Sequence, residues 1–106
     1  MSLHDFFSAE AIDLGLHAAD RAAALAAAVG LLHLDTKSAE TLLRVLTRRE
    51  QMGSTGMGRG IAIPHCRSLV VPRLRMAYAR LAEPLAWEAI DGKPVRHIFL
   101  IVAPPL

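Results

Sequence analysis

Cysteine is almost absent from this chain of 106 residues, and aromatic residues make up only 5% of it. The one cysteine, Cys66, cannot form a disulfide within the chain, which fits a reducing cytoplasm. No apolar run reaches the roughly 18 residues that a membrane span needs, and the alanine-rich stretch is interrupted by Gly30. The N-terminus has no basic start followed by an apolar core, so we see no signal peptide. We therefore expect a cytoplasmic protein without membrane insertion.

A large excess of charge of one sign is also missing, since 12 Lys and Arg residues face 10 Asp and Glu residues. Four arginines lie close together in the sequence: Arg67, Arg73, Arg75 and Arg80. A nucleic-acid surface would need more net charge and interleaved aromatic residues, so we expect no nucleic-acid partner. The simplest interpretation of the four arginines is a solvated face. Arginine also binds phosphate through its planar fork, which leaves an acidic or phosphorylated protein partner open.

The apolar residues amount to 53% of the chain, which is ample for a core, and the length fits one domain spanning residues 1–106. Alternating apolar residues over 11–17 predict a short strand. A helix is predicted over 19–34, with Asp20 as its N-cap, and a second over 35–51. Both helices would therefore precede most of the strands.

The second half of the chain reads mainly as strands. Four glycines interrupt the chain after the second helix, and strands are predicted over 61–65, 74–82 and 95–105. Residues 83–94 read as a loop with Asp91 and Gly92 at its tip. This order predicts an α/β or α+β fold, a single domain whose mixed β-sheet is flanked by helices. Because the last strand is very apolar and only two helices are available to cover it, we expect that this chain lacks the C-terminal part of its domain.

The stretch GSTGMGRGIAIPHCRS, residues 53–68, fits neither common phosphate-binding motif. A P-loop needs Lys followed by Ser or Thr after its last glycine, whereas Gly60 is followed by Ile61. A dinucleotide fingerprint has a strand, then glycines, then a helix, and here the helix comes first. His65 and Cys66 would point to opposite faces of an extended segment, and the other histidines are scattered. We therefore expect neither a metal site nor a Cys–His nucleophile pair.

His65 remains as a solitary imidazole at the end of a predicted strand. The ordinary alternative is a strand-end histidine bonded to a carbonyl group. Pro64 restricts the backbone before the ring, and the glycines allow other groups to come close. Ser54 and Thr55 offer hydroxyl groups, and Arg49 ends the preceding helix. An imidazole, glycine amides, hydroxyl groups and a guanidinium are the groups needed to hold a phosphoryl group on nitrogen.

The sequence RREQMGSTGMGRGIAIPHCR, residues 48–67, closely resembles the phosphorylation-site signature of the mannitol/fructose-type enzyme IIA domain of the phosphoenolpyruvate-dependent phosphotransferase system. Its GSTG form is most similar to the fructose and nitrogen-regulatory members, and DGKPVRHIFLIVAPP, residues 91–105, also resembles the family. The resemblance implies a IIA type 2 fold, with His65 as phosphoryl acceptor and Arg49 beside it. It implies supporting or phosphoryl-binding roles for five further residues: Ser54, Thr55, Gly56, Gly60 and Pro64.

The same resemblance implies a reversible phosphoryl relay that needs no metal and no organic cofactor. The donor would be phosphorylated HPr or its nitrogen-branch counterpart. Two features depart from the family. Its members continue into a helix with a second active-site histidine, which this chain does not reach. Cys66 stands where another small residue is more usual, and cysteine is small enough to fit.

Three functions remain open at this point. The first is a regulatory phosphoprotein in which the phosphorylation state of His65 is the signal for a target protein. The second is a sugar-specific component that passes the phosphoryl group to an enzyme IIB. The third is a non-catalytic binding module with the same fold.

Overall fold

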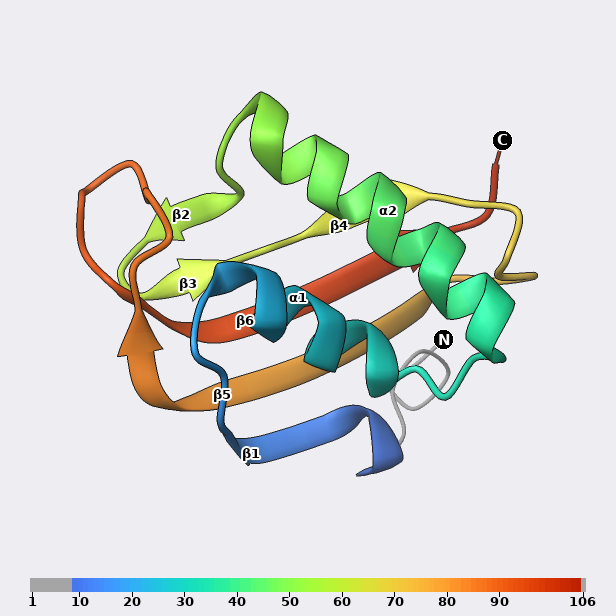
Figure 1. Ribbon diagram of the computed structural model, residues 1–106, viewed down its shortest axis with the longest axis horizontal. Helices are drawn as coiled ribbons and strands as arrows, with labels where there is room; N and C mark the ends of the chain where they lie inside the picture. Colours follow the sequence, from blue (N-terminus) through green and yellow to red (C-terminus); the bar gives the residue numbers. More distant parts are fainter. Residues whose placement is uncertain (1–8, 106) are drawn as a thin grey trace.

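The computed structural model describes residues 9–105, and its helices lie early in the chain, as predicted (Figure 1). Within these residues the helical elements are one 3-10 turn and two α-helices: η2 (Ala9–Ala11), α1 (Arg21–Gly30) and α2 (Thr36–Met52). The side chain of Asp20 accepts a hydrogen bond from the amide of Ala23 at 2.8 Å. The side chain of Asp35 does the same for the amide of Ser38 at 3.1 Å. The predicted N-cap Asp20 is therefore confirmed, and of Asp35 and Thr36, the two possible starts of the second helix, Asp35 is the N-cap.

Six strands form one mixed sheet, which confirms the predicted fold class. The strands are β1 (Ile12–Leu16), β2 (Gly56–Gly58), β3 (Ile61–Ala62), β4 (His65–Arg67), β5 (Arg75–Leu85) and β6 (Val95–Ala103). Their order is β1-β5-β6-β3-β2, with β4 also paired to β6. Strand β6 runs antiparallel to β5 and parallel to both β3 and β4. It therefore connects the long strand β5 with the short strands that follow α2.

Both helices lie against the same face of the sheet (Figure 1). Leucines of the helices, such as Leu25 and Leu42, are buried in one core with Ile98 and Leu100 of β6. Alternate residues of β5 and β6 point to the other face, where no helix among residues 9–105 covers them. There Tyr78 packs against Phe99, with ring centroids 4.9 Å apart. None of the helices within residues 9–105 is long and apolar enough to cross a membrane.

Three predicted strand boundaries around the glycines and prolines were wrong. Residues 56–58, expected to be irregular, pair with β3 as the short strand β2. The predicted strand 61–65 is instead two strands, because the chain leaves the ladder at Ile63 and Pro64, and proline has no N–H to donate. The strand predicted over 74–82 continues to Leu85, and Pro84 lies where the pairing with β6 is irregular.

The alternating pattern in β1 predicted a strand correctly but did not indicate which residues are buried. Ile12 and Leu14 are 42% and 56% exposed, whereas Leu16 is buried. The pairing of β1 with β5 shifts register between Asp13 and Leu16. This irregularity explains why one period-two series of apolar residues does not share one environment.

Candidate functional site

His65 is the first residue of β4, an exposed position on a short strand beside β6. The preceding residue, Pro64, is buried, and its carbonyl oxygen accepts the amide of Ile101 at 3.0 Å. The Nδ1 atom of His65 lies 2.8 Å from the carbonyl oxygen of Ile63. A carbonyl oxygen only accepts, so Nδ1 carries the proton and donates it. The lone pair of a neutral His65 ring is therefore on Nε2.

Arg49 lies in the last turn of α2, and its side chain shares a surface groove with His65. The groove has a volume of about 450 Å³. It is lined by residues from α2, β4 and β6: Val45, Arg49, His65, Cys66, Arg67, Ile101 and Ala103. The Nη1 atom of Arg49 donates to the carbonyl oxygen of Gly53 at 2.6 Å. The structure thus brings the predicted acceptor and the predicted arginine to one groove.

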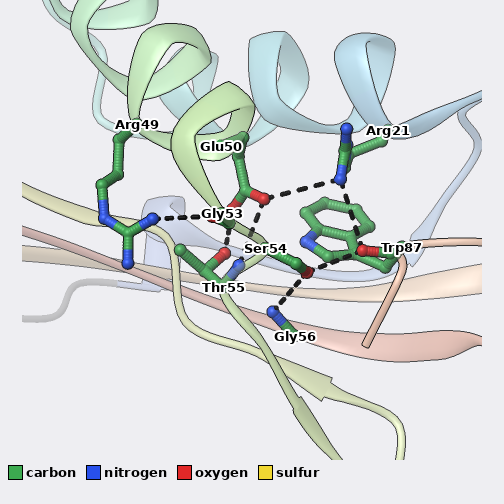
Figure 2. Close-up of polar contacts among 8 residues, drawn as sticks. All are labelled: Arg21, Arg49, Glu50, Gly53, Ser54, Thr55, Gly56 and Trp87. Atoms are coloured by element: carbon green, nitrogen blue, oxygen red, sulfur yellow. Dashed lines mark hydrogen bonds and ion pairs between the residues drawn. The ribbon is translucent and has the colours of Figure 1, made fainter. Parts of the chain in front are cut away.

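The hydroxyl groups of Ser54 and Thr55 are both used inside the protein (Figure 2). Ser54 donates to the carbonyl oxygen of Trp87 at 2.7 Å and accepts from the amide of Gly56 at 3.0 Å. The Thr55 hydroxyl donates to the carboxylate of Glu50, which also accepts the Thr55 amide at 3.2 Å. Each hydroxyl has only one proton to give. In this arrangement both residues fix the shape of the turn.

Gly56 lies so close to another segment that any side chain at this position would force neighbouring atoms to move. A β-carbon added there would lie 2.8 Å from both the Cα and the Cβ of Ala89, in the loop between β5 and β6. The absence of a side chain at Gly56 therefore allows this turn to pack closely against the loop between β5 and β6. Gly60 has a φ of +77°, and its carbonyl oxygen accepts the amides of Arg96 and His97. Gly60 therefore attaches the site segment to the start of β6, and Gly56 lets the segment pack against the loop between β5 and β6.

The loop between β5 and β6 holds the glycine segment at a further point. The carboxylate of Asp91 accepts the amide of Arg59 at 3.0 Å and the amide of Lys93 at the same distance. These hydrogen bonds lower the pKa of Asp91 below its ordinary value, because they favour the charged carboxylate. The tip of the loop is thereby bonded to the turn between β2 and β3.

Sequence reasoning missed three residues beside the site: Glu50, Arg21 and Trp87 (Figure 2). Glu50 is only 4% exposed, and its carboxylate lies 3.8 Å from the guanidinium of Arg21 on α1. Arg21 also donates to the carbonyl oxygen of Trp87 at 3.3 Å. One signal was available, because an acidic residue in the last turn of a helix opposes the helix dipole. A residue type placed against its local preference often has a tertiary partner.

The four clustered arginines do not form one surface. Arg75 is half-buried and donates to the carbonyl oxygen of Leu32, whereas Arg80 donates to that of Leu14 beside β1. Arg75 and Arg80 are five residues apart along β5, so their side chains lie on opposite faces. Arg67 lines the groove of His65 and donates to the carbonyl oxygen of Pro104 at 3.0 Å. Of the three whose contacts are described, only Arg67 therefore borders the candidate site.

Cys66 lies next to His65 and is about half-buried. Burial raises the pKa of its thiol above the ordinary value, because the charged thiolate is less well solvated there. The thiol form therefore prevails near neutral pH. Among residues 9–105, no three His, Cys, Asp or Glu side chains come together as a group that could hold a metal ion.

The fold and the site together define a class of protein: a small α/β domain with an exposed histidine on a strand beside the central strand, in a groove also lined by an arginine from the end of a helix. The model of the family described as phosphoenolpyruvate-dependent sugar phosphotransferase system, EIIA 2, matches residues 5–105. The chain belongs to this family, which confirms the resemblance found in the signature.

The curated relatives include nitrogen regulatory proteins and sugar-specific components. A nitrogen regulatory protein of Bradyrhizobium diazoefficiens is 37% identical over 71 residues, which is 67% of this chain and 46% of the relative. The 2-O-alpha-mannosyl-D-glycerate-specific EIIABC component of Escherichia coli is 41% identical over 69 residues, 64% of this chain and 10% of the relative. This chain therefore spans less than half the length of these curated relatives.

Solved structures agree with the fold. The nitrogen regulatory protein IIA-Ntr of Neisseria meningitidis superposes with a TM-score of 0.88 at 32% identity, covering 98% of this chain and 72% of that one. The mannitol IIA of Escherichia coli superposes with a TM-score of 0.75 at 22% identity, covering 92% of this chain and 72% of that one. The second likeness shows the fold alone.

Proposed function

We propose that this protein is a phosphohistidine carrier that accepts a phosphoryl group on Nε2 of His65. The observation that carries the proposal is the hydrogen bond from Nδ1 to the carbonyl oxygen of Ile63 at 2.8 Å. This bond fixes the tautomer in which Nε2 has the lone pair, and the ring lies in a groove shared with Arg49. A nucleophilic nitrogen beside a guanidinium is suited to phosphoryl transfer.

The transfer step balances without any further reactant. The lone pair of Nε2 attacks the phosphorus atom in line, and the P–N bond of the donor's phosphohistidine breaks. The donor imidazole, protonated on its other ring nitrogen, keeps that electron pair and leaves as a neutral ring. The proton of His65 stays on Nδ1, hydrogen-bonded to the carbonyl oxygen of Ile63. Arg49 would neutralise charge on the equatorial oxygens of a loose transition state through donors that Gly53 does not occupy. The reverse step has the same geometry, so the transfer is reversible.

We propose phosphorylated HPr or its nitrogen-branch counterpart as the donor and a regulatory role as the main function. The likeness to nitrogen regulatory proteins, at 32% identity to a solved structure covering 98% of this chain, favours this role. In that role the phosphorylation state of His65 would be read by a target protein. A relay of this kind belongs in the cytoplasm, where the thiol of Cys66 would remain reduced.

A second candidate is a sugar-specific component that passes the phosphoryl group to an enzyme IIB. The 41% identity to a 2-O-alpha-mannosyl-D-glycerate-specific EIIABC component favours it. A mannitol IIA of the same fold has also been solved in complex with a phosphorylated enzyme IIB. The two candidates share the chemistry at His65 and differ in what receives the signal or the phosphoryl group.

The proposal is tested by incubating the protein with phosphoenolpyruvate, enzyme I and HPr, or with the nitrogen-branch proteins. Mass spectrometry should show one added phosphoryl group, and ³¹P NMR should identify the Nε2-linked isomer. His65→Ala should abolish labelling, whereas His97→Ala, which changes a histidine outside the groove, should not. Discharge to an added enzyme IIB would favour the sugar-specific role. If neither donor set labels the protein, the remaining function is that of a non-catalytic binding module.

A further inference from the structure

Glu50 is a buried carboxylate in an unfavourable place. It is 4% exposed and lies in the last turn of α2, where the helix dipole is negative. Its only ion pair among the described residues is with Arg21, at 3.8 Å from a side chain that is 29% exposed. A buried charge with one long ion pair costs stability unless its hydrogen bonds compensate. Its hydrogen bonds therefore indicate what it does.

Both carboxylate oxygens of Glu50 are occupied by a single residue, Thr55. One oxygen accepts the Thr55 amide at 3.2 Å, and the other accepts the Thr55 hydroxyl (Figure 2). Bonds from both the backbone and the side chain leave Thr55 little rotational freedom. Because a charged acceptor strengthens each bond, this contact attaches the glycine turn firmly to α2.

The orientation of the Thr55 peptide is passed on to His65 through two further hydrogen bonds. The carbonyl oxygen of Thr55 accepts the amide of Ile63 at 3.1 Å. The carbonyl oxygen of Ile63 in turn accepts the proton on Nδ1 of His65 at 2.8 Å. An unbroken series of contacts thus runs from the buried carboxylate to the ring that carries the proposed reaction.

A second branch connects the same helix turn to Arg49. The amide of Gly53 donates to the backbone carbonyl oxygen of Glu50 at 3.2 Å. The carbonyl oxygen of Gly53 accepts from Arg49 at 2.6 Å. The peptides that hold the arginine and the histidine are therefore both attached at residue 50.

We propose that Glu50 is a positioning residue for His65: it holds Thr55, and through Thr55 and Ile63 it keeps the His65 proton on Nδ1 and the lone pair on Nε2. Its effect on phosphoryl transfer rests on the function proposed above, whereas its effect on the tautomer does not. Arg21 is the ion-pair partner of Glu50, at 3.8 Å.

The test compares Glu50→Gln with the wild type by two measurements. Glutamine has the same shape but only one oxygen, so it cannot accept from both the amide and the hydroxyl of Thr55. ¹⁵N NMR of the neutral His65 ring should show a smaller fraction of the Nδ1–H tautomer. Rapid-quench labelling should show a rate constant at saturating donor that is roughly 10-fold lower, equivalent to about 1.4 kcal/mol. The donor concentration at half-maximal rate should change little, since the groove surface is unaltered.

Matched variants separate this role from general effects. Glu40→Gln removes an exposed carboxylate from the same helix and should behave as the wild type in both measurements. Thr55→Val keeps the shape of Thr55 but removes its hydroxyl, and it should reproduce the tautomer shift. Thr55→Ser retains the hydroxyl and should restore most of the rate. If circular dichroism shows that Glu50→Gln does not fold, the comparison of Thr55→Val with Thr55→Ser tests the proposal instead.

A wild-type tautomer ratio in folded Glu50→Gln, or in folded Thr55→Val where the first variant does not fold, would overturn the proposal. A tautomer shift combined with failure to label even the wild-type protein would leave the positioning role standing and would count against the proposed function. A lower rate with an unchanged tautomer would also contradict the proposal, because the loss would then arise elsewhere.

Discussion

The guanidinium of Arg49 and the carbonyl oxygen of Gly53 are 2.6 Å apart, so the last turn of α2 is bonded to the residue where that helix ends. One nitrogen of the fork is used in this contact. The remaining donors of the fork are free to meet phosphate oxygens at the same time.

We predict that Arg49→Lys slows labelling of His65 roughly 10-fold or more, since each 1.36 kcal/mol lost from the transition state is a factor of ten. Lysine has a single ammonium group, which cannot keep Gly53 and also bind two phosphate oxygens in a fork. Rapid-quench labelling from the phosphorylated donor measures the rate. Arg48→Lys, at an exposed position one residue earlier, is the matched control. Equal rates in the two variants would assign Arg49 to the helix end alone.

We predict that Gly56→Ala lowers the free energy of unfolding by about 1–3 kcal/mol, because its β-carbon would overlap Ala89 and the loop must move. Urea denaturation measures the effect. Gly15→Ala is the control, since nothing lies within 4 Å of a β-carbon there. It should change stability by no more than about 0.5 kcal/mol in either direction. Similar urea midpoints for Gly56→Ala and Gly15→Ala would show that the loop around Ala89 can move at little cost in stability.

We predict a pH-dependent contribution from the N-cap Asp35. Hydrogen bonds from Ser38 lower the pKa of Asp35 below its ordinary value. A carboxyl group with a lowered folded-state pKa stabilises the fold above its unfolded pKa of about 3.9 and loses that contribution as the pH falls through the folded value. Asp35→Asn retains a capping side chain but does not titrate. The difference in stability between the wild type and Asp35→Asn should shrink as the pH falls below about 5 and through the lowered pKa of Asp35. A constant difference would contradict the assignment.

We predict that Arg67, which borders the His65 groove, contributes to docking of an acidic or phosphorylated protein partner. Arg67→Glu should raise the donor concentration at half-maximal labelling several-fold, and the wild-type reaction should slow as salt rises. Arg80→Glu is the control, because Arg80 lies beside Leu14 at another edge of the sheet. Equal effects of the two variants would indicate a general influence of net charge, and tight binding of duplex DNA at physiological salt would contradict a protein partner.

The local signals predicted the helices well because capping and periodicity are short-range properties. Asp20 and Asp35 start the helices where the sequence placed them. The strand β2 was missed because a Gly-Met-Gly segment has no alternation, and it is a strand only because β3 lies beside it. The exposure of Ile12 and Leu14 could not be predicted either, since it depends on the irregular pairing of β1 with β5, which is far away in the sequence.

At the site, the sequence indicated His65 and Arg49 because an imidazole and a guanidinium have a chemistry that can be recognised from the residue type alone. The structure brings these two residues to one groove. Their roles in transfer stay predictions. The contacts of Glu50 could not be predicted, because Arg21 is 29 residues away along the chain and meets it only in the folded core. Likewise, the partner of Ser54 is the backbone of Trp87, which no sequence pattern indicates.

The central place of β6 sets the order in which the site can be completed during synthesis. Strands β3, β4 and β5 all pair with β6, and the amides that bind Gly60 and Pro64 belong to Arg96, His97 and Ile101. A ribosome makes these residues some 30 positions after His65, so the imidazole emerges in a nascent chain that has no ladder to hold it. Such long-range pairing forms late and slowly. A polypeptide still in translation would therefore expose His65 before its strand is held in the sheet, and the proposed acceptance of a phosphoryl group would begin only once β6 has left the exit tunnel.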